Sequence, residues 1–301
     1  MHCGEGLISE EGEYSDSIFD SLVLDSNGLR CRHTETSFEY GVEVTVQDAD
    51  GNRFSGYWWD ATPMLKDLNI SDCGETAFKR AMSQIGPVKI ESGKYSMVID
   101  SEVASRLVTP VLNALGGYSL QQKNSFMLDS LEKKMFPEWL NIWDRPVSVG
   151  ETGSRLFDSE GVATAETPII ENGVVKEYFI NTYISKKMGV DPTIEDATRP
   201  VLLPCVAPSI AGKATSESSM TGTASVAEPV EATCGKEELM RIVGDGILVT
   251  GFNGGNSNSA TGDFSFGVEG FLFKDGKIVH PVREMLITGN LLTLWNNLLA
   301  A

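Results

Sequence analysis

Two short runs of polar residues combine carboxylate and hydroxyl side chains that could contact a substrate. Asp158-Ser159-Glu160-Gly161 places two carboxylates on alternate positions close to Arg155, and Thr261-Gly262-Asp263-Phe264-Ser265 enters a predicted strand. Each carboxylate could face a substrate, and each could equally complete a turn or cap a helix, since Asp is favoured in both places. The candidate substrate-contacting residues are therefore Asp158, Glu160, Thr261 and Asp263.

The three histidines of the chain form no familiar metal or nucleophile motif. A catalytic zinc needs three protein ligands and an open position, and a helical site uses His-Glu-x-x-His or a near variant. His2, His33 and His280 are far apart in the sequence. G-x-S-x-G, Walker and C-x-x-C motifs are all missing, so neither a nucleophile elbow nor a phosphate loop is indicated. A composite site built from distant residues is the less favoured alternative.

The charge balance excludes several classes of partner. Twenty-four Lys and Arg against 42 Asp and Glu give a net charge of −18, which repels nucleic-acid phosphates and anionic membrane surfaces. No apolar run is long enough to span a bilayer, and the first residues lack the basic region of a signal peptide. Five scattered cysteines are typical of reduced thiols. We expect a cytoplasmic protein with no direct nucleic-acid or membrane partner.

The elements that must position these residues begin with a small β region. Residues 1–16 are acidic and poor in apolar residues, which predicts a flexible lead-in. The alternation of Val42, Val44 and Val46 predicts an antiparallel meander over roughly 20–60. A helix follows from Asp72, where Asp72 and Glu75 have capping-box spacing, and ends at Gly86-Pro87. Together these elements predict a unit over 17–88.

A larger, strand-rich region follows over 92–301, which makes the predicted fold class α+β. Asn172-Gly173 predicts the turn of a hairpin, and Asn181 to Met188 predicts a short helix stopped by Gly189. Gly251 to Asn256 is interpreted as a loop, and Ile287 to Leu299 as a closing helix. Between Ser209 and Cys234, 16 of 26 residues are Ser, Thr, Ala or Gly, which predicts a flexible surface insertion at about 209–234.

The order and spacing of several motifs resemble the TldD/PmbA family of cytosolic metallopeptidases, and its PmbA (TldE) branch in particular. The matching pieces, all from about Ser92 onward, include Ser92-Gly93-Lys94-Tyr95, Asn124 to Leu131, Asp158 to Val162, Thr261 to Ser265 and Thr288-Gly289-Asn290-Leu291. The unit over 17–88 resembles the middle region of the family. The N-terminal domain of the family is expected to be missing from this chain.

The resemblance implies a role without hydrolysis by this chain alone. In the family, TldD-type subunits carry His-Glu-x-x-x-His on the helix after the first strand of the C-terminal domain, and PmbA-type subunits lack those ligands and pair with them. The assembly degrades or trims unfolded or extended peptides, and an older name for it is modulator of DNA gyrase. Here the corresponding helix, Leu107 to Leu115, contains no His, Glu or Cys. No catalytic residue and no metal ligand is therefore assigned to this chain.

Three hypotheses follow from the resemblance. The first is a PmbA/TldE-like subunit of a dimer, with a TldD-like partner or a second copy, in which zinc is bound by the TldD-like partner. Asp158, Glu160, Thr261 and Asp263 then become candidates for lining a peptide groove. The second is a self-sufficient metallopeptidase that uses an unrecognised site including His280, Cys205 or Cys234. The third is a non-enzymatic peptide-binding or scaffold protein.

Overall fold

The computed structural model describes residues 6–208 and 235–301, so the predicted insertion at 209–234 lies outside the described residues. The chain forms two compact units. The first contains the described residues up to Val88 together with Pro146–Ala165. The second contains Lys89–Arg145 and Glu166–Ala301. The sequence pattern did not predict that residues 146–165 would return to the first unit.

The first unit is built on a three-stranded antiparallel meander, which confirms that prediction. Its strands are β1 (Leu7–Leu24), β2 (Arg30–Gln47) and β3 (Arg53–Thr62), in the order β1-β2-β3. Residues 7–16, predicted as a flexible lead-in, instead form the first part of β1 and pair with β2. The acidic side chains of this segment are exposed while its backbone makes the ladder, so the low apolar content did not prevent strand formation.

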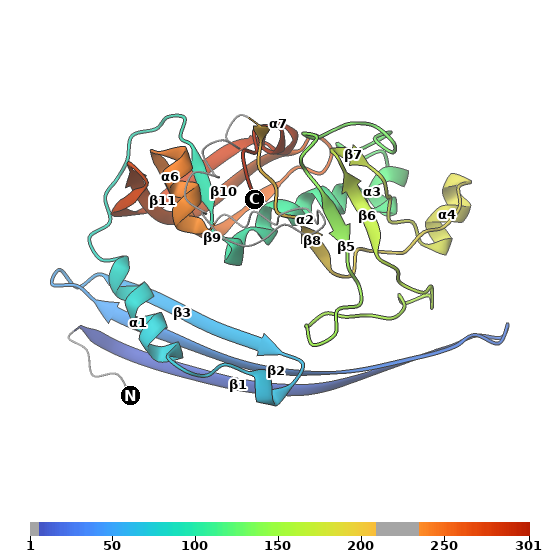
Figure 1. Cartoon of the computed structure of the whole chain (residues 1–301), viewed down its shortest axis with the longest axis horizontal. Helices are drawn as coiled ribbons and strands as arrows, with labels where there is room; N and C mark the ends of the chain where they lie inside the picture. The colour runs from blue at the N-terminus through green and yellow to red at the C-terminus, as the bar shows by residue number, and fades with distance from the viewer. Residues whose placement is uncertain (1–5, 209–234) are drawn as a thin grey trace, which may run out of the picture. The chain divides into compact units, whose positions relative to one another are not determined.

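One helix covers one face of this sheet (Figure 1). After the 3₁₀ turn η1 (Leu65–Asp67), helix α1 (Cys73–Ser83) buries Ala77 and Ala81 against β2 and β3. The predicted capping box does not form, because Asp72 has a φ of 58° and its side chain makes no capping hydrogen bond. An N-cap side chain reaches the first amides from an extended backbone, which Asp72 does not have.

The ribbon of β1 and β2 runs beyond the end of β3 (Figure 1). Strand β3 pairs only with residues 38–47 of β2, so residues 17–24 and 30–37 form a two-stranded extension. The segment 146–165 packs on this extension, where the Cys31 Sγ lies 4.0 Å from the carbonyl oxygen of Gly161. A Cβ at Gly161 would overlap the side chain of Leu29, so glycine allows this close approach.

The second unit contains two four-stranded sheets. The first has the order β11-β10-β9-β4, with β4 parallel to β9 and the other pairs antiparallel. Its strands are β4 (Met97–Ile99), β9 (Gly246–Ser257), β10 (Asp263–Lys274) and β11 (Lys277–Asn290). The second sheet has the order β7-β6-β5-β8, with strands β5 (Ile142–Asp144), β6 (Thr167–Glu171), β7 (Val174–Val175) and β8 (Pro200–Leu202).

Helices and a shared core hold the second unit together. One buried cluster joins residues of both sheets with helix α2, among them Val111, Ile169, Val249, Phe266 and Leu291. The helical elements are η2 (Ser101–Val103), α2 (Ser105–Ala114), α3 (Gly117–Gln121), α4 (Thr182–Met188), α6 (Lys236–Val243) and α7 (Leu291–Asn296). Within the described ranges, no helix is both long and apolar enough to cross a membrane.

Two interpretations of the C-terminal sequence were wrong. Gly251 to Asn256, interpreted as a loop, lies inside β9, where Gly254 and Gly255 have φ values of 102° and 88° beside an irregularity in the β9–β10 register. Glycine permits this backbone within a strand at little steric cost. Ile287, interpreted as the start of the closing helix, is still in β11, and α7 begins at Leu291.

Candidate functional site

A large open groove lies within the second unit. The groove measures about 1810 Å³ over the described residues, well above the usual range for a small-molecule site. Its walls come from the segment around β4, from α2, from the second half of β11 and from α7.

Strand β11 forms one wall and supplies an open sheet edge. In the described part of the chain, β11 pairs with β10 on one side only. The register shifts between Val268 and Gly270, so that Arg283 and Glu284 together oppose Glu269. Glu284 lines the groove with a φ of 54°. Two residues opposite one define a β-bulge, a device that re-aims side chains beside functional sites.

Apolar side chains line the other walls. Helix α2 contributes Leu107, Val108 and Leu112, and the C-terminal segment contributes Leu294 and Leu298. Leu286 on β11 also lines the groove and is 67% exposed. An extended peptide placed here would bury its side chains against apolar surface, which is the main source of binding energy in such grooves.

Trp295 adds an unusual polar group to this wall. The residue lines the groove and is only 6% exposed, and its indole Nε1 is buried with no acceptor among the described residues. Indole N–H groups normally find a partner when buried, since an unpaired buried donor costs about 1–3 kcal/mol.

Charged residues of the groove are held in place by other charges. The Arg283 Nε lies 3.7 Å from a Glu269 carboxylate oxygen, which also accepts a hydrogen bond from the Asn253 amide at 3.0 Å. The Lys236 Nζ lies 2.8 Å from Asp100, whose other oxygen accepts from the Glu102 amide. The groove therefore presents fixed charges of both signs along an otherwise apolar lining.

Thr261 and Asp263 form a turn with Asn290. The Thr261 hydroxyl donates to Asp263 Oδ2 at 2.8 Å, and the Asn290 amide donates to Asp263 Oδ1 at 3.0 Å and to the Thr261 carbonyl at 2.8 Å. These donors hold the pKa of the Asp263 carboxyl below its usual range, with Asn290 as the larger cause. Neither Thr261 nor Asp263 lines the groove, although their neighbours Phe264 and Gly289 do.

Asp158 and Glu160 lie in the first unit, so the structure places the four candidates in two pairs in different units. Asp158 is buried, and its Oδ1 accepts hydrogen bonds from the amides of Glu160 at 3.0 Å and Val162 at 2.9 Å. Those bonds complete a tight turn with a left-handed Gly161, whose φ is 81°. Glu160 is exposed. Contact of either side chain with a peptide stays a prediction.

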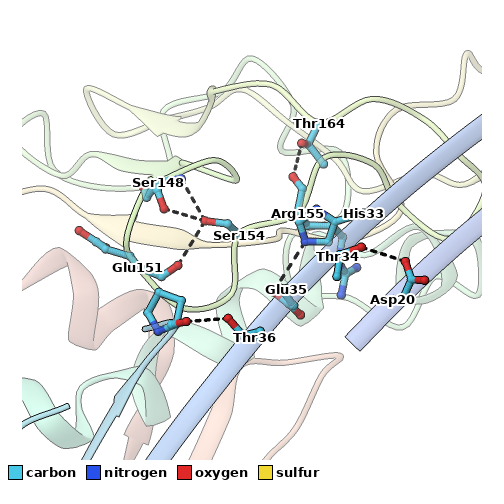
Figure 2. Close-up of polar contacts among 11 residues, drawn as sticks. Asp20, His33, Thr34, Glu35, Thr36, Ser148, Glu151, Ser154, Arg155 and Thr164 are labelled. Atoms are coloured by element: carbon cyan, nitrogen blue, oxygen red, sulfur yellow. Dashed lines mark hydrogen bonds and ion pairs between the residues drawn. The ribbon is translucent and has the colours of Figure 1, made fainter. Parts of the chain in front are cut away.

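The same segment is fixed by hydroxyl groups, as Figure 2 shows. The Ser154 hydroxyl lies between the backbones of Ser148 and Glu151, donating to the Ser148 carbonyl at 2.9 Å. Thr164 donates to the carbonyl of Arg155. Ser154, Asp158 and Thr164 thus use their side chains to hold the backbone of this segment.

Among the described residues, the α2 wall of the groove offers no zinc ligands. The groove-lining residues of α2 are Leu107, Val108, Thr109 and Leu112, whose carbon side chains and single hydroxyl do not fit a zinc ion. No three His, Cys, Asp or Glu side chains of residues 6–208 and 235–301 come together as a metal site. His280 is exposed on β11, and Cys234 lies outside the described residues.

Cys205 is a poor candidate for chemistry. Its thiol is buried, and burial raises its pKa above the usual value. The thiolate is the form that attacks a carbonyl or binds a metal, so a raised pKa lowers its reactivity. The structure gives Cys205 a backbone role instead, since its N–H and C=O exchange hydrogen bonds of 2.9 Å with Ala301.

Sequence reasoning missed most of the groove. Trp295 lies in the predicted closing helix, and Arg283 and Leu286 lie just before it, with no motif to mark any of them as site residues. The one usable signal was the apolar face of Leu107 to Leu112. That face indicated a packed helix, and only the fold shows that part of it borders an open groove.

Comparison with known proteins identifies the group to which this fold belongs. The family model of the PmbA/TldA metallopeptidase C-terminal domain matches residues 92–301, and that of the central domain matches residues 5–85. The chain belongs to the PmbA/TldD metallopeptidase family. This confirms the resemblance seen in the sequence, and the central-domain match includes the residues of β1 that were predicted as a lead-in.

Curated relatives carry PmbA names. A Metalloprotease PmbA homolog from Haemophilus influenzae is 33% identical over 227 residues, covering 75% of this chain and 45% of its own length. A Metalloprotease PmbA homolog from Buchnera aphidicola is 30% identical over 311 residues, covering 98% of this chain and 64% of its own length. The chain thus spans between about half and two thirds of these PmbA relatives.

Solved structures of the PmbA/TldD family share the fold. A candidate modulator of DNA gyrase from Bacteroides thetaiotaomicron superposes with a TM-score of 0.86 at 40% identity, covering 99% of this chain and 62% of its own. TldE from Thermococcus kodakarensis superposes with a TM-score of 0.75 at 20% identity, covering 94% and 61%. The mixed α+β fold class predicted from the sequence is confirmed.

Proposed function

We propose that this chain is a PmbA/TldE-like, non-hydrolytic subunit of a cytoplasmic two-component metallopeptidase that acts on unfolded or extended peptides. It holds part of the peptide in the groove beside β11, and a TldD-like partner supplies the zinc ion and the hydrolytic residues. The observation that carries the proposal is the edge of β11, which is open among the described residues and borders a mainly apolar groove. Main-chain pairing with such an edge binds peptides of many sequences.

Two further observations support this division of labour. The groove side of α2 carries Leu107, Val108 and Leu112 where a metal-binding helix would present nitrogen, oxygen or sulfur donors. The chain is similar in sequence to a PmbA homolog and, at 22% identity, to a Metalloprotease TldD homolog, both from Buchnera aphidicola. It is similar in fold to a solved TldE structure. A pair of homologous subunits with different duties is consistent with both observations.

Metal analysis and peptide cleavage test the division of labour. The purified chain is expected to carry only trace zinc and to leave an unfolded peptide intact. Adding a TldD-like protein with His-Glu-x-x-x-His should restore one zinc ion per pair and cleavage together. Stoichiometric zinc with cleavage by this chain alone would support the self-sufficient enzyme instead. If this chain does not change the rate at which the partner cleaves the peptide, the result would support a separate binding or scaffold role.

A pair of matched variants tests the groove itself. Leu286→Asp puts a charge on the groove wall, whereas Leu131→Asp puts the same charge at an exposed leucine outside the groove. We expect Leu286→Asp to weaken binding of an unfolded peptide by about tenfold, because one desolvated apolar contact of this size is replaced by a carboxylate. Leu131→Asp should leave peptide binding unchanged. Equal effects of both variants would contradict the groove assignment.

A further inference from the structure

Strand β1 offers a second open sheet edge, in the first unit. It lies at the end of the order β1-β2-β3 and pairs only with β2 in the described part of the chain. Helix α1 packs on β2 and β3. The strand has 18 residues, which corresponds to an edge of about 60 Å. An edge of this length is a ready template for pairing with another chain.

The register shows which backbone groups face the open side. The Asp25 N–H donates to the Leu29 carbonyl at 3.2 Å beside the turn, and the register then runs unbroken from Leu24 back to Ser9. Antiparallel pairs alternate between bonded and non-bonded positions, so odd-numbered residues of β1 bond to β2. The N–H and C=O groups of even-numbered residues, from Glu10 to Leu24, therefore face the open edge.

Among the devices that normally block pairing, the edge carries acidic side chains and one terminal irregularity, which would still admit a strand of opposite charge. Strand β1 contains no Pro and no Lys, and its register irregularity lies at the far end, between Leu7 and Ser9. Ile18, Leu22 and Leu24 share one face of the ribbon and are 75%, 53% and 61% exposed. An incoming strand would cover these side chains while satisfying the free backbone groups. The edge is thus attractive both to a backbone and to apolar side chains.

Charge decides which kind of strand fits. All five charged residues of β1 are acidic, namely Glu10, Glu11, Glu13, Asp16 and Asp20. On β2, Glu43 lies directly opposite Glu11, so like charges already face each other before any partner binds. Among these described acidic residues, Asp20 alone has a basic partner, the Arg32 guanidinium of β2 at 2.8 Å. The Thr34 hydroxyl also donates a hydrogen bond to Asp20 (Figure 2). A second copy of β1 would add more negative charge.

We infer that the open edge of β1 binds an extended, Lys- or Arg-bearing strand of another protein by strand addition. Main-chain hydrogen bonds to the even-numbered residues supply the attachment. Basic side chains of the incoming strand pair with Glu11 and Glu13 on one face, and its apolar side chains cover Ile18 and Leu22 on the other. This site is separate in the sequence and in the fold unit from the groove beside β11, and it is independent of the proposed peptidase role.

A pair of substitutions at one position tests the strand pairing. Ile18 has its N–H on the open side, so Ile18→Pro blocks the edge while leaving the β1–β2 ladder bonds in place. Ile18→Ala removes the same side chain and keeps the N–H. The probe is the synthetic peptide Lys-Val-Lys-Thr-Lys-Val-Lys-Thr, with binding followed by fluorescence anisotropy. We expect Ile18→Pro to bind at least about tenfold more weakly than Ile18→Ala. Equal binding by the two variants would overturn strand addition.

Hydrogen exchange locates the bound peptide in the intact chain. Even-numbered amides of β1 should gain protection on peptide binding, and the odd-numbered amides, already bonded to β2, should change little. Protection should persist in Leu286→Asp, which alters only the groove. Protection confined to β11 would place the peptide in the groove and overturn the inference. The proposed function would be unaffected by loss of protection in β1.

Charge reversal tests the choice of partner. The double variant Glu11→Lys/Glu13→Lys should lose binding to the Lys peptide and gain binding to the same peptide with Glu in place of Lys. The control Glu138→Lys/Asp191→Lys makes the same change in net charge in the second unit and should bind as the parent does. Equal binding of the Lys and Glu peptides by the double variant and by the parent would overturn the inference that the partner strand is basic. Sedimentation showing a dimer that Ile18→Pro dissociates would replace the partner strand with a second copy.

Discussion

The side-chain amide of Asn290 donates a hydrogen bond of 3.0 Å to the carboxylate of Asp263, and the Asn290 carbonyl Oδ1 caps α7. One side chain therefore ties the start of β10 to the end of β11 and to the first turn of the following helix. The Thr261 hydroxyl, the Asp263 carboxylate and the Asn290 amide together form this turn. The turn supports one end of the sheet that borders the groove.

Two substitutions at Asn290 separate the cap from the link to Asp263. Asn290→Ala removes both, and loss of a helix cap alone costs about 1 kcal/mol in the free energy of unfolding. Asn290→Asp keeps an acceptor for the amides of Leu292 and Thr293 but loses the amide donor. We expect Asn290→Ala to lose about this amount in urea denaturation, whereas the loss in Asn290→Asp comes from repulsion between its carboxylate and Asp263. An unchanged free energy of unfolding in Asn290→Ala would contradict the capping role.

The Asp263 pair also predicts a pH dependence. Because the folded-state pKa of Asp263 is lowered, its contribution to stability is present above the unfolded-state pKa of about 3.9 and is lost as pH falls through the folded pKa. In Asn290→Asp the second carboxylate should raise the pKa of Asp263, which NMR titration of the side-chain carboxyl would detect. An unchanged titration would show that Asn290 does not control this group.

Glu177 is expected to behave in the opposite way. Burial raises the pKa of its carboxyl, and a hydrogen bond with Thr193 only partly opposes that effect. A raised folded-state pKa means that the stability it contributes is present below the unfolded pKa and is lost as pH rises through the folded pKa. Glu177→Gln should therefore be more stable than the parent at neutral pH, with the difference shrinking towards about pH 4.

Thermal unfolding across this pH range checks the Glu177 prediction. The matched control is Glu138→Gln, which changes an exposed glutamate of the second unit. That control should give parallel curves for parent and variant. If Glu177→Gln raises the thermal stability by the same amount at all pH values, the stabilisation comes from packing and not from removing a buried charge.

Trp295→Phe tests whether the indole N–H of Trp295 has only a structural role or donates a hydrogen bond to a bound ligand. Removing a buried donor that lacks an acceptor should leave the peptide-free chain as stable as the parent or more stable, by up to about 1–3 kcal/mol. If a bound peptide supplies the acceptor, the same change weakens peptide binding. Denaturation and peptide titration together decide between the two roles. A large loss of stability in Trp295→Phe would point to an acceptor within the chain.

Gly56→Ala tests how closely α1 approaches the first sheet. A Cβ at this β3 position would overlap the backbone of Ala77 and Ala81 on α1, so the helix must move away. Overpacking of this kind typically costs about 1–3 kcal/mol. The control Gly12→Ala places its Cβ at 3.4 Å from the Tyr40 hydroxyl, an ordinary contact. Hydrogen exchange of α1 should accelerate in Gly56→Ala and not in Gly12→Ala.

Local signals predicted the parts of the fold that local backbone chemistry decides. Asn172 and Gly173 have φ values of 49° and 76°, as the predicted hairpin turn requires. Asn181 caps α4 through its side chain, and Gly189 ends that helix at a φ of 70°. In such cases two or three neighbouring residues determine the conformation, and the sequence shows all of them.

Long-range packing determined the parts that were missed. Asp158 and Asp263 each lie in a short run with hydroxyl and glycine residues, yet each is held by bonds to its own turn, and their units differ. Nothing in their spacing shows which of them lies near a groove. Gly254 and Gly255 resemble loop residues, but β10 pairs with this segment and converts it into strand. The groove depends on segments more than a hundred residues apart, which no local pattern records.

The return of residues 146–165 to the first unit has a consequence for synthesis. The segment that packs against Leu29 and Cys31 leaves the ribosome only after β4, α2 and β5 have been made. At a synthesis rate of roughly 5–20 residues per second, that face of the β1–β2 extension stays uncovered for several seconds or more. The last residues of the first unit are thus synthesised after part of the second unit, so the first unit can be completed only while the second is being made.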